Sequence, residues 1–277
     1  MFALLLLAAA ARLPDDGLIQ RFEEGRRFEE TLDVTTVTRP PDSPDADPVR
    51  GRYTLTLTTE TADADASGAG LRSRLDSIRT SITSPGGTVD AAYDSDNRRV
   101  EDDGLGRGEA EEAADAALKS VWEPLRGLTL RRQASAAGGL SLGEWVGRVA
   151  GGDDDAVAEA AAASLTTAVA VPLPEGPLDS WTGEADWPLG GQAVPVLRLM
   201  TYDGKTADGQ DRIKLSLASK AGGPQLAGKG EALFDRSLGR VVSVDLVIKA
   251  ETRRDGEPLA VTSTNIAWRL RPLPAGA

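Results

Sequence analysis

The segment Arg240–Thr252, RVVSVDLVIKAET, alternates apolar and polar side chains along most of its length. Apolar residues occupy the even positions from Val242 to Ala250, and polar or charged residues occupy most of the odd positions. This period of two is typical of a β-strand that has one buried face and one solvated face. The segment therefore predicts a strand that needs a covering layer on one side.

The sequence on both sides of this segment repeats the same alternation. The preceding run, residues 226–235, and the following run, residues 259–270, each place apolar or small residues on a single face: Leu226, Gly228, Gly230, Ala232 and Phe234 in the first, and Ile266, Trp268 and Leu270 in the second. Arg236–Gly239 and Asp255–Gly256 separate the runs and suit antiparallel hairpins. We therefore predict a three-stranded antiparallel meander over residues 226–270.

Two glycines lie on the apolar face of the first of these strands. Gly228 and Gly230 have no side chain at positions where the alternation places a residue that faces the core. Glycine inside a strand permits a sharp bend or the close approach of another backbone. The pair indicates a strongly curved sheet with a helix in its concavity.

Further strands are expected in the N-terminal part of the chain. Residues 27–36 and residues 51–61 alternate in the same way. The 71–82 stretch is ambiguous, because its apolar residues have the spacing of a helical stripe: Leu71, Leu75, Ile78 and Ile82. Ser84–Gly87 follows as a turn, and residues 89–93 alternate beyond it, so we favour a strand that pairs through this turn.

Two helices interrupt the strand pattern. Residues 110–125 carry an apolar stripe, and residues 156–168 are rich in alanine and follow three aspartates that suit a helix N-cap. Strands resume near Trp181, and residues 194–202 are apolar on both faces, as expected for a central strand. The predicted fold class is α+β, with a strongly curved antiparallel sheet (a half-barrel) and two or three helices packed on its concave face. Residues 18–277 would form this single domain, with a helical insertion at about 108–170.

The N-terminus has the features of a secretory signal peptide. Phe2–Ala11 is apolar but too short to span a bilayer, and Ala8–Ala10 supply small residues before the polar exit at residues 12–17. No Lys or Arg follows Met1 directly, which departs from the usual pattern. We predict that residues 1–17 are a signal peptide with a short exit segment, and that the protein is periplasmic or secreted. The alternative is a buried or disordered N-terminal tail.

Composition excludes several classes of function. The chain contains no Cys and no His, which removes thiol catalysis, disulfides, Ser-His-Asp triads and the usual zinc sites. A net charge of -12 argues against nucleic acid as a partner. No further stretch is long and apolar enough to cross a membrane, so we expect no transmembrane segment.

Acidic loops are the remaining candidates for chemistry. Asp94–Asn97, Asp153–Asp155 and the loop from Asp203 to Asp211 could each offer oxygens to a hard cation, but a single loop seldom supplies the six to eight that calcium needs. We interpret them as solvated turns or caps. A glycosidase-type carboxylate pair is defined by its separation in space, which sequence does not give. Without a nucleophile-plus-base signature, we predict a non-enzyme with no catalytic, metal-binding or cofactor-binding residues.

The large aromatic residues are the candidates for ligand binding. On a concave face they would line a pocket for an apolar ligand, and the candidates are Trp122, Trp181, Trp187, Phe234 and Trp268. The alternative interpretation is core packing, since large aromatics carry much of the buried area of a core.

The order of elements resembles the half-barrel proteins of the bacterial envelope, the lipoprotein-carrier (LolA-like) and LppX-like group. It is more similar to a family of uncharacterised secreted proteins common in planctomycete-type bacteria. The resemblance covers nearly all of the mature chain and is carried by short motifs: Gly25–Phe28, Tyr93–Asp96, Pro172–Pro174 before Ser180–Trp181, Thr201–Gly204, and Gly230–Asp235 running into Gly239–Val241. It implies no catalytic residues. The absence of Cys departs from lipid-anchored members.

Three functions remain open at this point. The first is a non-enzymatic envelope protein that binds a lipid or acyl chain in the concavity of the sheet. The second is an envelope interaction or scaffold module with a filled core and no ligand, whose partner would be an envelope protein. The third is a carboxylate-based hydrolase. A Leu-, Val- and Trp-lined pocket would favour the first, a packed concavity the second, and two facing carboxylates of raised pKa the third.

Overall fold

The computed structural model describes residues 17–41, 45–87, 90–96, 108–141, 143–147, 155–189, 192–220, 225–254 and 257–274. The predicted signal peptide, apart from Gly17, lies outside these residues. Within them, no helix has the length and hydropathy needed to span a membrane. The elements, in chain order, are β1 (Arg27–Arg39), β2 (Val49–Ala62), β3 (Gly68–Thr83), η1 (Pro85–Gly87), β4 (Asp90–Asp94), α1 (Glu109–Trp122), η2 (Glu123–Leu125), β5 (Thr129–Ser135), β6 (Glu144–Val146), α2 (Asp155–Ala163), η3 (Ser164–Ala168), β7 (Ser180–Leu189), β8 (Gln192–Lys205), β9 (Asp211–Ser219), β10 (Leu226–Asp235), β11 (Arg240–Arg254) and β12 (Glu257–Pro272).

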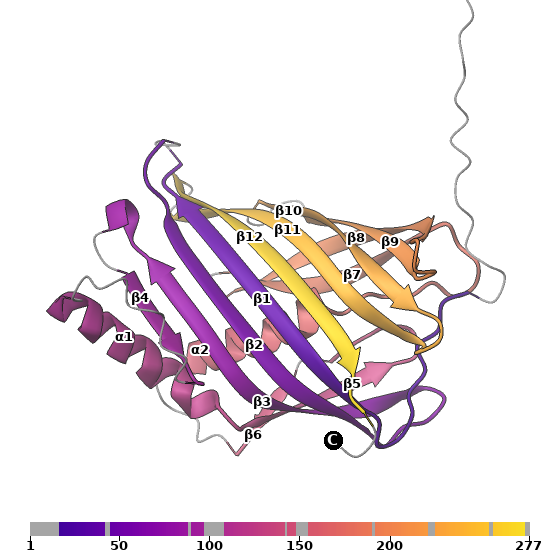
Figure 1. Ribbon diagram of the computed structural model, residues 1–277. Coiled ribbons are helices and arrows are strands. Elements are labelled where there is room, and N and C mark those ends of the chain that lie inside the picture. The colour runs from indigo at the N-terminus through magenta and orange to yellow at the C-terminus, as the bar shows by residue number, and fades with distance from the viewer. Residues whose placement is uncertain are drawn as a thin grey trace, which may run out of the picture.

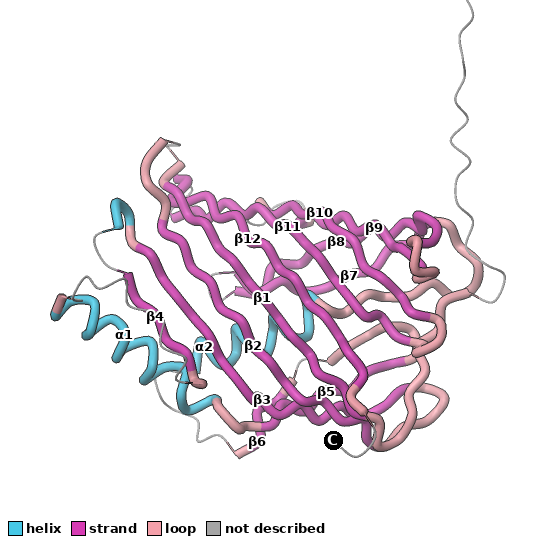
Figure 2. Tube along the Cα trace, in the orientation of Figure 1, coloured by secondary structure: helices cyan, strands magenta, loops and turns pink. Residues whose placement is uncertain are grey.

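The described strands form one antiparallel sheet of 12 strands (Figures 1 and 2). Its order is β6-β5-β3-β2-β1-β12-β11-β10-β9-β8-β7, and β4 pairs with β3 beside this path. The sheet is curved but open, because β6 and β7 at its two ends do not pair with each other. The predicted fold class, a half-barrel with helices on its concave face, is confirmed.

The meander predicted at residues 226–270 is confirmed as β10, β11 and β12. The even-numbered residues from Val242 to Ala250 are buried, whereas Val247 and Lys249 are exposed. At Gly230, a Cβ atom would overlap the carbonyl oxygen of Asp245 on β11. The close backbone approach expected at this glycine is therefore present.

Strand β1 joins the two halves of the chain. It pairs with β2 on one side and with β12 on the other, so Leu32 lies opposite both Leu55 and Trp268. The inward residues of these three strands belong to one hydrophobic cluster. The N-terminal and C-terminal strands thus share a single core.

The ambiguous 71–82 stretch lies in β3, and its pairing with β4 through the predicted turn is confirmed. Its helix-like spacing has a local cause. The register between β2 and β3 shifts so that Leu75 faces Leu57 and Ser77 faces Thr56, which leaves Asp76 as an extra residue. Such a bulge changes which residues point inward. Leu75 and Ile78 are therefore both fully buried although they are three residues apart.

Strand β8 differs from the sequence-based expectation. Residues 194–202 were predicted to form a central strand buried on both faces, but β8 is next to the edge strand β7. Its even-numbered residues are buried, while Leu197 and Leu199 on the other face are 45% and 46% exposed. The strand is apolar on both faces because one face packs against the core and the other carries exposed leucines on the surface.

Helix α1 lies beside β4 at one side of the sheet, and α2 lies behind the sheet in the view of Figure 1. The first turn of α1 carries Glu109, Glu111 and Glu112, where the helix dipole favours negative charge. The end of α1 reaches the core, because Trp122 is buried with its ring centroid 5.5 Å from that of Tyr53. The predicted insertion at 108–170 contains both helices and also contributes β5 and β6 to the sheet.

Candidate functional site: the concave face and its buried polar network

The concave face of the sheet is covered by the inner segment, which we define as residues 155–174. It consists of α2, η3 and the extended residues that follow. Most of its buried side chains are small or aliphatic, and these are Ala158, Ala161, Ala162, Ala163, Leu165, Ala168, Val169, Val171 and Leu173. Alanine allows a helix to approach a sheet closely, so this composition suits a segment that fills the concavity.

Hydrogen bonds from the sheet fix the inner segment near its middle and near its C-terminal end. The Tyr53 hydroxyl on β2 donates to Ser164 Oγ at 3.0 Å. On the other side, the Trp181 indole N–H on β7 donates to the carbonyl oxygen of Pro172 at 2.7 Å. β2 and β7 lie far apart in the sheet order, so the segment bridges the concavity from one half to the other.

The predicted ligand-binding aromatics are all buried and lie on different elements. Trp122 ends α1, Trp181 and Trp187 lie on β7, Phe234 on β10 and Trp268 on β12, and they are 2–8% exposed. Within the described residues, cavities of about 10 Å³ and about 30 Å³ adjoin the inner segment. Of the five residues, Trp268 lines the larger of these cavities and the other four line neither. The structure places the five within the core rather than around one pocket.

A charged network is buried beneath the inner segment. Glu30 on β1 and Arg132 on β5 form an ion pair with 2.6 Å between Oε1 and Nη2, and both side chains are at most 2% exposed. Thr59 and Trp268 donate further hydrogen bonds to the Glu30 carboxylate, at 2.7 and 3.3 Å. Arg132 also donates to Ser73 Oγ and to the carbonyl oxygen of Leu165. The network therefore ties the inner segment to five strands of the sheet: β1, β2, β3, β5 and β12.

Sequence reasoning missed this network, although a signal was present. Glu30 lies between Phe28 and Leu32 on the inward face of β1, where alternation would place an apolar residue. Arg132 occupies the same kind of position on β5, and Arg198 on β8. A charged residue at an inward position of a strand needs a buried partner, so these three interruptions mark the polar part of the core.

The charge state of Glu30 couples stability to pH. Burial raises the pKa of Glu30, but the Arg132 charge and hydrogen bonds from Arg132, Thr59 and Trp268 outweigh burial and hold the pKa below its ordinary value of 4.5. A lowered pKa in the folded state stabilises the fold above pH 4.5, and this contribution is lost as the pH falls below it.

We therefore expect the free energy of unfolding of the wild-type protein to decrease more steeply below pH 4.5 than that of Glu30→Gln, which cannot titrate at this position. Urea unfolding between pH 7 and pH 3 measures both curves. Because other carboxylates affect the two proteins equally, parallel curves would show that Glu30 does not contribute.

Arg198 holds the part of the inner segment that directly follows Leu165. It is 7% exposed, and its guanidinium donates to the carbonyl oxygens of Ala170 and Thr167, each at 2.5 Å. These carbonyls lie at the end of η3, where the helical backbone leaves acceptors unpaired. Burial lowers the pKa of Arg198 to about 10, so the side chain remains charged at neutral pH.

Replacing Arg198 by methionine is expected to lower the free energy of unfolding by about 1–3 kcal/mol, because two buried carbonyl oxygens lose their donors. Arg198→Lys keeps the charge but cannot donate to both carbonyl oxygens with the same geometry. Its free energy of unfolding should lie between those of the wild type and Arg198→Met. The expected signature is faster amide hydrogen exchange confined to residues 164–171. Unchanged exchange there in Arg198→Met would exclude this anchoring role.

The acidic loops considered for cations are occupied by internal partners where the structure describes them. Asp203 pairs with Lys214 at 2.9 Å and with Arg212 at 3.6 Å. The fully buried Asp211 accepts hydrogen bonds from Tyr202 and Arg236. Asp94 pairs with Arg79, while Asn97, Asp153 and Asp154 lie outside the described residues. The described chain contains no cluster of three acidic side chains able to hold a metal.

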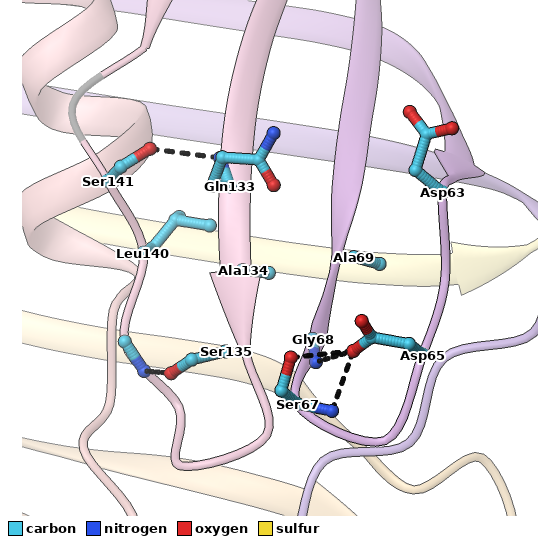
Figure 3. Close-up of a pocket in the computed structure, with 11 residues that line it drawn as sticks. Asp63, Asp65, Ser67, Gly68, Ala69, Gln133, Ala134, Ser135, Leu140 and Ser141 are labelled. Carbon is cyan, nitrogen blue, oxygen red and sulfur yellow. Dashed lines mark hydrogen bonds between the residues drawn. The ribbon is translucent and has the colours of Figure 1, made fainter.

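A shallow polar pocket of about 380 Å³ lies where β3 and β5 meet (Figure 3). Asp65 Oδ1 accepts hydrogen bonds from the Ser67 hydroxyl, the Ser67 amide and the Gly68 amide, and these bonds lower the pKa of Asp65. Ser141 and Ser135 accept bonds from nearby backbone amides. These polar groups stabilise turns.

Every described carboxylate with a resolved shift, namely Glu30, Asp65 and Asp235, has a lowered pKa, whereas a general acid needs a raised one.

The outer face of the sheet carries an apolar patch, defined by Leu197, Leu199, Ala218, Ala227 and Val247. All five are exposed. Leu197 faces Ala218, which faces Ala227 on the next strand, whereas Leu199 faces Ser216 and Val247 on β11 faces Lys229. Val247 lines an open depression of about 710 Å³ over β9 to β12 and β1, which is also lined by charged residues of both signs.

No protein-family model matches this chain, and no curated protein matches it. A similar solved structure is that of DynF from the dynemicin biosynthesis pathway of Micromonospora chersina, which is 8% identical in sequence. The match covers 97% of this chain and 88% of DynF, with a TM-score of 0.23. A similarity at this level carries no argument about function.

Proposed function

We propose that this chain is a non-enzymatic interaction or scaffold module with a filled core and no bound lipid, and that it acts outside the cytoplasm. The observation that carries the proposal is the inner segment. A carrier of acyl chains needs an apolar cavity of several hundred Å³. Here the space is occupied by residues 155–174, and the adjoining cavities measure about 10 and 30 Å³.

The anchoring of the inner segment supports the same function. Arg132 and Arg198 donate from opposite halves of the sheet to main-chain oxygens of Leu165, Thr167 and Ala170. Moving the segment aside for a lipid would remove both carbonyl acceptors of Arg198 and the Leu165 acceptor of Arg132. Such a cost opposes opening of the concavity.

The apolar patch on the outer face is the surface that would contact a partner protein. Exposed apolar groups that lie in register across neighbouring strands are typical of interaction sites. Leu197 and Leu199 are the large side chains of this patch, and nothing in the core requires them to be apolar.

Native mass spectrometry tests the absence of a lipid. The protein is isolated under mild conditions from the cells that make it, and is also incubated with phospholipid vesicles. We expect the bare mass of the polypeptide in both cases. A lipid of fixed mass that is lost on mild denaturation would overturn the proposal and favour a carrier.

Site-specific photo-cross-linking tests the interaction surface. A benzoylphenylalanine at position 199 is expected to yield one discrete cross-linked protein in the native cells. The matched control places the same group at Glu112, an exposed residue of α1 on another side of the molecule. Cross-linking that is equal at both positions, or absent at position 199, would remove the patch as a docking surface.

A further inference from the structure

A small cavity adjoins the buried charged network. Its volume is about 30 Å³, and its lining includes Glu30, Arg132, Arg240, Gln20 and Trp268. A cavity needs about 10–15 Å³ of such volume to hold one water molecule. This cavity therefore has room for one or two small species beside two arginines.

Positive charge exceeds negative charge around this cavity. Glu30 is ion-paired with Arg132, and the Arg132 Nε atom is buried without a hydrogen-bond acceptor. Arg240 is 6% exposed, and its guanidinium lies 4.6 Å from the Phe22 ring centroid and 5.1 Å from that of Phe28. Within the described part of the chain, it donates no hydrogen bond and forms no salt bridge. Among the described residues that line the cavity, the Glu30 carboxylate is thus the single negative charge beside two buried guanidinium groups, those of Arg132 and Arg240.

A buried charge without a partner is costly, and proteins normally compensate it. Stacking on two aromatic rings offsets part of the cost for Arg240. The buried Nε atom of Arg132 still lacks an acceptor, and the cavity that both arginines line is the adjacent space able to supply one.

We propose that this cavity binds a small monovalent anion of about the size of chloride, held between Arg132 and Arg240. A halide is spherical, needs no acceptor from the protein and fits the volume, whereas a sugar acid such as gluconate is too large. The anion would leave the cluster of two arginines and Glu30 without net charge. This site is independent of the outer patch and of the proposed interaction.

Thermal unfolding of the full chain at constant ionic strength tests the site. Replacing 200 mM sodium gluconate by 200 mM sodium chloride is expected to raise Tm by about 3 °C or more, because an anion that binds only the folded state stabilises it. In Arg240→Met this difference should disappear. The control Arg271→Met removes an exposed arginine, whose side chain is 72% exposed, and should retain the full difference.

Crystals of the wild-type protein grown in bromide give a readout that does not depend on any variant. We expect an anomalous difference peak between the guanidinium groups of Arg132 and Arg240. Equal Tm values for the wild type in the two salts, or ordered water without an anomalous peak in the cavity, would overturn the proposal.

Discussion

Replacing Arg132 by methionine is expected to lower the free energy of unfolding by about 3–5 kcal/mol, the loss typical of removing one partner of a buried ion pair. The change leaves the Glu30 carboxylate buried without its counter-charge, while Thr59 and Trp268 continue to donate to it. It also removes a donor from the Leu165 carbonyl of the inner segment. Urea unfolding at pH 7 measures the effect.

Two further variants test whether the loss of stability in Arg132→Met comes from the unpaired buried charge and not from the replacement of arginine by methionine as such. Arg271→Met breaks the surface pair with Glu29, and we expect a loss of about 0–1 kcal/mol. The double variant Glu30→Leu and Arg132→Met removes both buried charges and should recover much of the stability lost in Arg132→Met. If Arg132→Met were no more destabilising than Arg271→Met, the network would not be part of the folded core.

Replacing Gly230 by alanine is expected to destabilise the protein by about 3 kcal/mol, the upper end of the usual range for overpacking. The added methyl group would overlap the carbonyl oxygen of Asp245, which is backbone and cannot rotate away. The strands β10 and β11 would have to separate at this point. Thermal or urea unfolding measures this loss.

Gly228 provides a matched control on the same face of the same strand. There a Cβ atom would lie 3.0 Å from the Val247 carbonyl oxygen and 3.1 Å from side-chain atoms of Ile248 and Leu217, so small adjustments can relieve the contact. We expect a clearly smaller loss for Gly228→Ala. Equal stabilities of the two variants would contradict the close approach at Gly230.

Strand periodicity predicted much of the fold because burial on one face leaves a direct trace in the sequence. Residues 242–250 alternate, and the structure buries the expected face. The bulge at Asp76 was not predictable in the same way, since an extra residue in one strand is defined only by its pairing with β2. The edge position of β8 depends on the order of strands in the sheet, which alternation does not encode.

The candidate site was harder to predict than the fold. The five aromatic residues were identified by type, but whether they line a pocket depends on what occupies the concavity. That occupant, the inner segment, has an alanine-rich sequence that predicts helix but does not reveal its location. Glu30, Arg132 and Arg198 interrupt apolar faces, so their burial could have been inferred. Their partners could not, because the Glu30–Arg132 pair joins residues far apart in the chain.

Amide hydrogen exchange of residues 155–174 tests the central claim, that the inner segment is a fixed part of the core. We predict that amides hydrogen-bonded within α2 and η3 exchange as slowly as those of β1 and β12, and that phospholipid vesicles leave their rates unchanged. Rates in this segment that are much faster than in the sheet, or that respond to lipid, would contradict the account and show that the concavity opens.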